Sequence, residues 1–123
     1  MCYSTIVMYD FKSAHPLRKR LEEADKVLEK FPTMVPIIIQ ARPGCTLPDI
    51  DKHKYIVPGE MVMSQFMVLI RRRLKLDKNK GIFVFVGKNT LPKSSSLLGE
   101  LYKEYMESDK FLYITYTDEN TFG

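Results

Sequence analysis

The pattern of hydrophobic and polar positions predicts an amphipathic helix near the start of the chain. Apolar residues recur there at spacings of four and three, which places them on one helical face: Leu17, Leu21, Ala24, Leu28 and Phe31. Pro16 suits the first helical turn, and Pro32 follows the last apolar position and ends the segment. Ser13 is the predicted cap.

Two further helices are predicted in the second half of the chain. Between Glu60 and Leu74 the helical period is carried by five apolar residues: Val62, Phe66, Leu69, Ile70 and Leu74. Ser95 or Ser96 is predicted to cap the other helix, which extends to about Ser108. Its apolar stripe consists of Leu98, Leu101, Tyr102 and Tyr105.

Runs of β-branched and apolar residues predict four strands. They span 34–40, 54–58, 82–86 and 111–117. The first run, MVPIIIQ, is apolar on both faces, as in a strand buried within a sheet. Pro36 cannot donate a hydrogen bond to a neighbouring strand, so we expect it at the start of that strand.

The predicted order is helix, strand, strand, helix, strand, helix, strand, which is the order of a ubiquitin-like β-grasp fold with an added leading helix. The fold class is therefore α+β, with a four-stranded mixed sheet. A ferredoxin-like sandwich would repeat a strand–helix–strand unit, and the closely spaced first two strands disfavour it. We divide the single domain into an N-terminal helical extension (1–31), a β-grasp core (32–117) and a flexible tail (118–123).

Composition narrows the class of protein without naming a function. The chain has 123 residues, 45% of them hydrophobic and 28% charged, as expected of one soluble globular domain. No secretory signal is expected, and no apolar run approaches the roughly 20 residues that cross a bilayer. The two cysteines, Cys2 and Cys45, form no disulfide framework, so we expect reduced thiols and a cytoplasmic location. The net charge of +4 favours acidic partners without choosing among peptides, lipids and nucleic acid.

The sequence disfavours an enzyme. The two cysteines and two histidines lack the spacing of a zinc site, and no glycine-rich phosphate loop is present. A catalytic pair of Cys45 with a histidine is much less expected than a surface thiol, since a nucleophile needs an oriented base beside it. We expect no catalytic residue, no metal and no cofactor.

A basic cluster, Arg71 to Lys75, ends the helix predicted to close at Leu74. Cations at a helix C-terminus complement its dipole, which is the favoured explanation over a phosphate site. Nucleic-acid binding usually requires a broader basic face with interleaved aromatic residues. We therefore expect no nucleic-acid partner.

The segment KYIVP, 54–58, is short, is flanked by lysines and ends in proline, as edge strands often do. An exposed edge can bind a peptide by β-augmentation. Alternation places Tyr55 and Val57 on one face and Lys54 and Ile56 on the other. From composition alone, an edge that is only protected and an edge that binds a partner are equally compatible.

The polar segment 118–123 ends in Gly123, a residue without a side chain. A frayed terminus explains such a segment. A second interpretation is that the unhindered glycine carboxylate is carried into an enzyme tunnel and joined to an amine. The β-grasp fold strengthens this second interpretation.

From His15 to Gly123 the chain resembles the ubiquitin-like modifiers of autophagy, the GABARAP-like family. The motifs that carry the resemblance are HPLRKR, FPTMVPIII, DIDKHKYIVP, SQFMVLIRRRL, IFVFV, GELYKEY and DKFLYITYTDENTFG. They are long, ordered and nearly ungapped.

The resemblance implies two N-terminal helices before the β-grasp core, and conjugation through Gly123. An E1-like enzyme would adenylate the glycine, an E2-like enzyme would carry it as a thioester, and phosphatidylethanolamine would receive it. A cysteine protease would process the C-terminus and remove the lipid. The family acts in the cytoplasm and, when lipidated, on the autophagosome membrane, where it recruits cargo receptors and autophagy factors. The sequence has no residues after Gly123, which is expected of a processed form or of a protein that bypasses processing.

The resemblance also implies a docking site for aromatic-x-x-aliphatic motifs with nearby acids, paired with the edge strand at 54–56. The pocket for the aromatic residue would consist of Glu23, Val27, Pro36, Lys54, Ile56 and Phe111. The pocket for the aliphatic residue would consist of Tyr55, Val57, Pro58, Met61, Phe66 and Leu69. The cations facing the acids would be Lys52, Lys54 and Arg73. An unconjugated peptide-binding adaptor is the alternative function.

Overall fold

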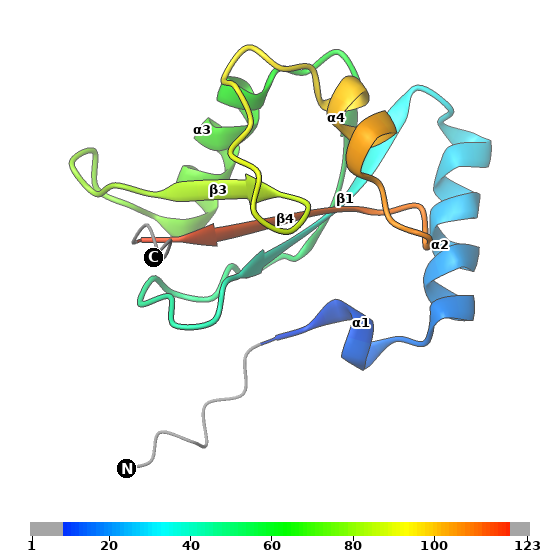
Figure 1. The fold of residues 1–123 in the computed structure, drawn as a ribbon, viewed down its shortest axis with the longest axis horizontal. Helices are drawn as coiled ribbons and strands as arrows, with labels where there is room; N and C mark the ends of the chain where they lie inside the picture. Colours follow the sequence, from blue (N-terminus) through cyan, green and yellow to red (C-terminus); the bar gives the residue numbers. More distant parts are fainter. Residues whose placement is uncertain (1–8, 119–123) are drawn as a thin grey trace.

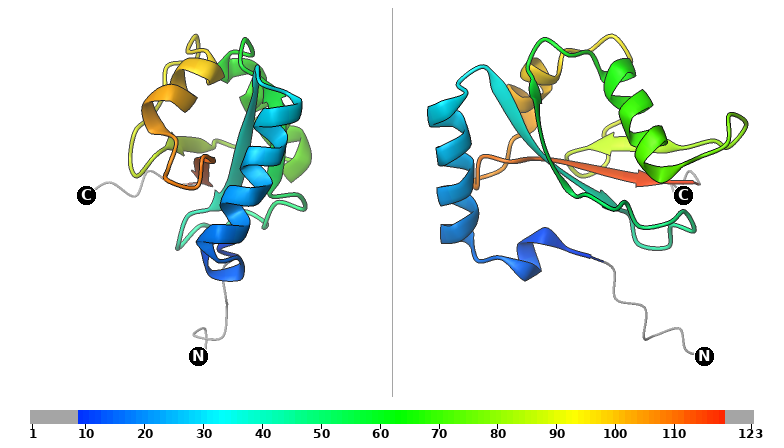
Figure 2. Two further views of the ribbon diagram at one scale, coloured as in Figure 1. Left: turned by 90° about the vertical axis from the view of Figure 1, so that its right-hand side faces the viewer. Right: turned by 180° about the vertical axis from the view of Figure 1, so that it is seen from behind.

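The computed structural model describes residues 9–118 and shows a four-stranded mixed sheet with helices around it (Figures 1 and 2). In chain order the elements are α1 (Phe11–Ala14), α2 (Leu17–Lys30), β1 (Met34–Ala41), β2 (Lys54–Pro58), α3 (Met63–Leu74), β3 (Phe83–Val86), α4 (Leu98–Tyr105) and β4 (Leu112–Thr117). This arrangement confirms the predicted α+β, ubiquitin-like class. It also contains the two helices that the resemblance implies before the first strand.

The strand order is β2-β1-β4-β3, with β1 and β4 parallel at the centre. Both outer pairs, β1–β2 and β3–β4, are antiparallel. In the central pair, Ile37, Ile38 and Ile39 pair with Leu112, Tyr113 and Ile114, and all six side chains are buried. The edge positions of the sheet therefore go to β2 and β3.

The two faces of the sheet pack against different helices. In Figure 1, α3 and α4 lie above the sheet, α1 lies below it and α2 stands across its right-hand end. Alternation sends Ile37 and Ile39 into the main core with α3 and α4. Ile38 points to the opposite face, into a smaller cluster with Phe11, Ala24, Phe111 and Tyr113. The N-terminal helices thus have a core of their own.

Pro36 lies within β1 and not at its start, so that prediction was wrong. It pairs with Ile56 of β2. Opposed residues in an antiparallel pair alternate between those that exchange hydrogen bonds and those that do not. Proline has no N–H, so the Pro36–Ile56 pair must be of the second kind, and the strand loses no ladder bond.

The start of α3 also differs from the prediction. The helix begins at Met63, whereas the apolar pattern had suggested Glu60. The Val62 N–H donates to the Gln65 side chain (3.1 Å), and Val62 forms an isolated bridge with Leu97. Val62 is therefore the extended residue that precedes the helix.

The bounds of α4 were predicted too widely. Leu97 precedes the helix as its cap position, and neither Ser95 nor Ser96 caps it with a side chain. The helix ends at Tyr105 because a turn follows, in which the Glu107 N–H donates to the Phe111 carbonyl (3.0 Å).

Ser13 does not cap α2. It lies inside α1, and its hydroxyl donates to the Asp10 carboxylate (2.6 Å). Pro16 occupies the cap position of α2, where no side chain forms a capping hydrogen bond.

Within residues 9–118, no helix combines the length and apolar character needed to cross a bilayer.

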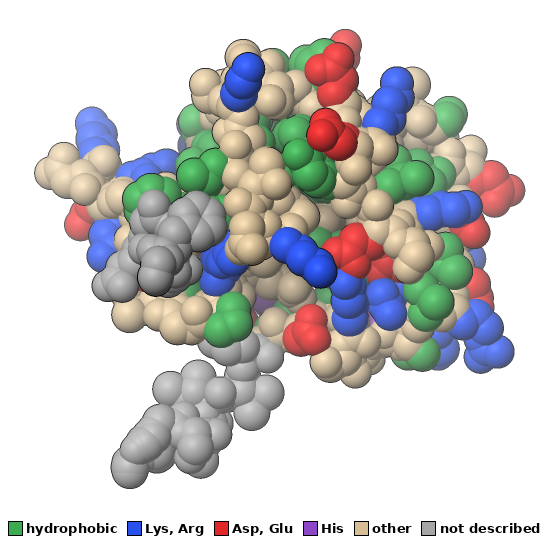
Figure 3. Space-filling view, in the orientation of Figure 1, with side chains coloured by type: hydrophobic (Ala, Val, Ile, Leu, Met, Phe, Trp, Pro, Cys, Tyr) green, Lys and Arg blue, Asp and Glu red, His purple; other side chains and the backbone are tan. Residues whose placement is uncertain are grey.

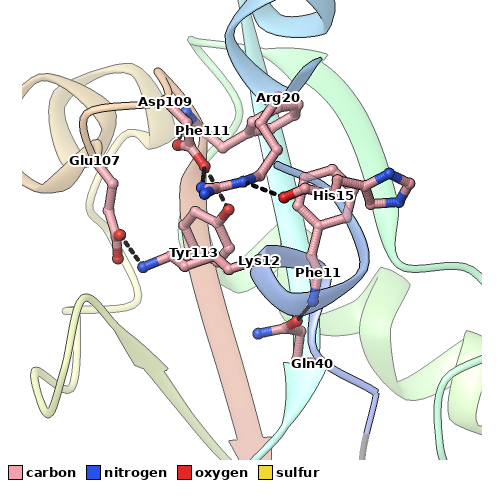
Figure 4. A network of polar contacts seen from close by, with 9 residues as sticks. All are labelled: Phe11, Lys12, His15, Arg20, Gln40, Glu107, Asp109, Phe111 and Tyr113. Carbon is pink, nitrogen blue, oxygen red and sulfur yellow. Dashed lines mark hydrogen bonds and ion pairs between the residues drawn. The ribbon is translucent and has the colours of Figure 1, made fainter. Parts of the chain in front are cut away.

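A buried carboxylate, Asp109, ties α2 to β4 (Figure 4). One of its oxygens accepts hydrogen bonds from the Arg20 guanidinium (2.6 Å) and the Tyr113 hydroxyl (2.5 Å). The other accepts from the Phe111 N–H (3.0 Å). Arg20 also donates to the His15 carbonyl (2.9 Å), so one side chain joins the turn before α2 to the start of β4.

We predict that Arg20→Met lowers the free energy of unfolding by about 3 kcal/mol, because it leaves the Asp109 carboxylate buried without its cation. Arg18→Met is the matched control. Arg18 is exposed and lies 3.9 Å from Glu22, so its loss should change the free energy by less than about 0.5 kcal/mol. Urea denaturation compares the two variants, and equal midpoints would contradict the structural role of Arg20.

Two glycines let α4 approach the turn after β2. The Gly99 N–H donates to the Gly59 carbonyl (2.8 Å). A Cβ on Gly99 would lie 3.0 Å from that carbonyl oxygen and 3.3 Å from the Gly59 Cα. Both neighbours are backbone atoms, which cannot turn aside as a flexible side chain could.

Gly99→Ala should therefore lower the free energy of unfolding by about 1 kcal/mol or more, despite the better helix propensity of alanine. Gly81→Ala is the control, since a Cβ there meets no atom within 4 Å. Thermal unfolding followed by circular dichroism measures both. A Gly99→Ala protein as stable as the Gly81→Ala protein would show that the contact can relax.

Candidate functional site

The open edge of β2 presents backbone groups at Lys54 and Ile56. The Ile39 N–H donates to the His53 carbonyl (2.7 Å), and the Gly59 N–H to the Thr33 carbonyl (3.0 Å). These bonds fall on alternate pairs of the β1–β2 register, and Lys54 and Ile56 lie on the other pairs. In antiparallel geometry their N–H and C=O groups therefore point away from β1, toward the free edge.

The residues predicted for the aromatic pocket gather on the face of the sheet that carries α2. Lys54 forms an ion pair with Glu23, which brings α2 to the edge strand. Val27 follows Glu23 by one helical turn and is half-buried. Pro36 pairs with Ile56, so the two share this face, and Phe111 is buried in the cluster beneath it. Ile56 itself is 41% exposed.

The residues predicted for the aliphatic pocket lie on the opposite face, against α3. Tyr55, Val57 and Phe66 are buried members of the main core, with the Tyr55 and Phe66 rings perpendicular at 6.2 Å. Met61 and Leu69 are half-buried and pack against that core, and Pro58 is exposed. The side chains of Tyr55, Val57 and Phe66 therefore lie beneath the surface at this site. Those of Pro58, Met61 and Leu69 are at least partly exposed and can contact a ligand.

Each of the three predicted cations already has a contact within the chain. Lys54 pairs with Glu23 as described above, and the Arg73 guanidinium lies 3.3 Å from Asp51. The Lys52 ammonium lies 5.3 Å from the centre of the Tyr55 ring. Exposed ion pairs of this kind contribute little to stability, so an incoming carboxylate can compete for these cations.

The Tyr55 hydroxyl is buried and lies near Arg73. Burial raises its pKa, and the nearby Arg73 guanidinium partly offsets that effect. The hydroxyl is therefore protonated at neutral pH.

Gly123, the predicted conjugation residue, lies outside the described residues, as do Phe122 and Cys2. Asp118, which the sequence analysis placed in the flexible tail, is held by Thr46. Its carboxylate accepts hydrogen bonds from the Thr46 N–H (3.1 Å) and hydroxyl. Sequence reasoning missed Thr46, because no local pattern links two residues that are 72 positions apart.

The arginine cluster divides its contacts. Arg71 donates to the Asp77 carbonyl (2.8 Å) beyond the end of α3, whereas Arg73 reaches Asp51. On the face shown in Figure 3, basic side chains are interspersed with acidic ones.

Among residues 9–118, no group of three His, Cys, Asp or Glu side chains is placed to hold a metal ion.

A hollow of about 430 Å³ adjoins the end of β2, lined by Thr33, Pro58, Gly59 and Glu60. Pro58 is the one lining residue that belongs to the predicted docking set. The hollow thus lies beside the candidate site.

Comparison with known proteins identifies the family. A family model described as "Autophagy protein Atg8 ubiquitin like" matches residues 19–123. The chain belongs to the Atg8 family. Similar members include Autophagy-related protein 8a of Arabidopsis thaliana and Autophagy-related protein 8A of Oryza sativa subsp. indica. Both are 45% identical over 113 residues, which cover 92% of this chain and 92% and 94% of those proteins.

Autophagy-related protein 8d of Arabidopsis thaliana is 43% identical over the same share of this chain and 93% of its own length. Membership of the Atg8 family confirms the resemblance that the motifs carried, and with it the assignment to autophagy. Atg8-family proteins are ubiquitin-like modifiers.

Proposed function

We propose that this Atg8-family protein is conjugated through Gly123 to phosphatidylethanolamine, and that it recruits autophagy receptors by docking aromatic-x-x-aliphatic motifs along β2. The observation that carries the docking half is the free edge of β2, with outward backbone groups at Lys54 and Ile56. The motif carrying the conjugation half is the terminal DENTFG, together with the family to which the chain belongs.

The geometry of an extended peptide supports docking on both faces of the edge strand. Successive side chains of a strand point to opposite faces, so residues three apart also point to opposite faces. An aromatic-x-x-aliphatic motif added to β2 would thus place its aromatic residue against the α2 side and its aliphatic residue against the α3 side. Of the residues predicted for the two pockets, Phe111 belongs to the cluster on the α2 side, and Tyr55, Val57 and Phe66 belong to the core on the α3 side.

The acidic residues that flank such motifs would meet the basic side chains of Lys52, Lys54 and Arg73. Lys52 and Lys54 are exposed on the edge, and Arg73 stands at the end of α3. Each would exchange a weak contact within the chain for one with the peptide. Because these groups are exposed, their attraction for the peptide falls as ionic strength rises.

Conjugation would be the work of partner enzymes, with this chain as the acyl donor. An E1-like enzyme would adenylate the Gly123 carboxylate with ATP and release pyrophosphate. Enzyme thiols, finally that of an E2-like enzyme, would then take the glycyl group as a thioester and release AMP. The amine of phosphatidylethanolamine would attack the glycyl carbonyl carbon, displace the thiol and form an amide, which a cysteine protease would hydrolyse. The protein would then act on autophagosome membranes when lipidated and in the cytoplasm when free. On the membrane, its lipid anchor would raise the effective concentration of partners bound to the same membrane.

The conjugation step is tested by Gly123→Ala in cells that carry the conjugation enzymes. The variant should lose the phosphatidylethanolamine adduct, because a methyl group on the terminal residue hinders a narrow activating site. Intact-mass analysis of the recovered protein measures the adduct. An adduct of equal abundance on the variant, or none on the unaltered chain, would remove Gly123 as the acyl donor and favour the unconjugated adaptor.

The docking surface is tested with one substitution on each face of β2. We predict that Ile56→Asp and Leu69→Asp each weaken binding of an aromatic-x-x-aliphatic peptide by about tenfold or more, because each places a charge against apolar side chains of the motif. Val68→Asp is the matched control. Val68 is 49% exposed, much as Ile56 is, and lies on α3 outside the predicted pockets.

Isothermal titration calorimetry with one acidic-flanked peptide compares the three variants. Full affinity in Ile56→Asp would exclude the pocket on the α2 side, and full affinity in Leu69→Asp the pocket on the α3 side. Equal losses in all three variants would show that the charge acts at a distance.

A further inference from the structure

The loop between β1 and β2 folds back over the end of β4. The Arg42 N–H donates to the Tyr116 carbonyl (2.8 Å), and the Cys45 N–H closes a turn on the Arg42 carbonyl (3.1 Å). Gly44 takes a φ of +85° in this turn, a conformation that residues with a side chain rarely adopt. The chain therefore reverses direction two residues before Thr46.

The second half of the loop is held by the hydroxyl of Tyr116, a fully buried residue of β4. This hydroxyl accepts a hydrogen bond from the Ile50 N–H (2.8 Å) and donates to the Pro48 carbonyl (2.9 Å). Burial raises the pKa of Tyr116 to about 12, so the hydroxyl retains the proton that it donates. Leu47 and Ile50 add buried apolar contacts. The segment that carries Thr46 is thus fixed on both sides by β4.

Thr46 uses this fixed position to hold the residue directly after β4. Its N–H and its hydroxyl donate to the two different oxygens of the Asp118 carboxylate. The hydrogen bond from the Thr46 hydroxyl, then that from the Thr46 N–H, and the nearby charge of Lys80 lower the pKa of Asp118. The carboxylate is therefore ionised at neutral pH, the form that accepts both hydrogen bonds.

This contact fixes the residue that follows β4. Thr117 is buried and pairs with Phe83, so the sheet itself fixes residue 117. The Thr46–Asp118 contact fixes residue 118 as well. Gly123 lies five positions after Asp118, and five residues of extended chain span at most about 17 Å. A fixed Asp118 confines Gly123 to the space within that reach.

We propose that Thr46 is a positioning residue for conjugation: by clamping the Asp118 carboxylate it fixes the origin from which Gly123 is offered to the activating enzyme. This role rests on the proposed conjugation through Gly123. Without the clamp, the fixed origin would move back from Asp118 to Thr117. One more residue could then change conformation before Gly123, so a smaller fraction of the chain's conformations would bring Gly123 into the enzyme. The apparent affinity for the enzyme would then fall in proportion to the competent fraction.

The test measures activation of the full-length chain by a recombinant E1-like enzyme of the autophagy conjugation system. Thr46→Val, which keeps the branched shape but lacks the hydroxyl, should raise KM by about threefold or more while kcat is unchanged, because the acyl chemistry belongs to the enzyme. Thr46→Ser keeps the donor and should restore a KM near that of the unaltered chain. Thr90→Val is the control, since Thr90 is exposed and its hydrogen bonds run through the backbone.

A second measurement reports on the clamp without any enzyme. The chemical shift of the Thr46 amide should titrate with the Asp118 carboxylate, at a pH below the ordinary range for aspartate. A carboxyl group whose folded pKa is lowered stabilises the folded state above its unfolded pKa, and this contribution is lost as the pH falls through the folded pKa. In Thr46→Val the titration should move upward, toward the ordinary value.

The outcomes separate the clamp from the proposed function. A raised KM in Thr46→Val, with normal peptide docking at β2 and rescue by Thr46→Ser, supports the positioning role. A KM equal to that of the unaltered chain overturns it, as does an amide shift that does not follow Asp118. If the unaltered chain itself forms no thioester while the amide titration is as expected, conjugation through Gly123 fails. The positioning role falls with it, although the clamp exists.

Discussion

The parallel pairing of β1 with β4 is the constraint on which the rest of the structure depends. Parallel strands cannot be joined by a tight hairpin, so a long crossover must separate them in sequence. That crossover contains β2, α3, β3 and α4. Since the centre of the sheet is taken by the first and last strands, β2 and β3 are left at its edges. The free edge on which the proposed docking depends is thus a consequence of topology.

The same pairing brings the end of the chain beside the β1–β2 loop. Neighbouring parallel strands have their C-termini at the same end of the sheet. The loop that leaves β1 therefore starts next to the residues that leave β4. Tyr116 uses this proximity to order the loop, and Thr46 in turn holds Asp118. The last strand therefore builds the support for the segment that follows it.

The two faces of the sheet have separate apolar cores. The α3 side has the main core, whereas the α2 side has a small cluster strengthened by the buried Arg20–Asp109 pair. That pair holds α2 beside β2, where Glu23 meets Lys54. Apolar groups consequently flank both faces of the edge strand. A peptide with alternating side chains could contact both.

Local patterns in the sequence predicted the four strands, three of the four helices, their β-grasp order, and the opposite faces of Lys54 and Ile56 against Tyr55 and Val57. These features follow from local periodicity and turn residues, which act over a few positions. That Pro36 could lie within a central strand did not follow from any local pattern, because its tolerance depends on the register with β2. The contacts of Lys54 with Glu23, of Arg20 with Asp109, and of Thr46 with Asp118 likewise depend on how the chain packs. These partners lie 31, 89 and 72 residues apart, and such contacts arise only when the packed sheet has brought distant segments together.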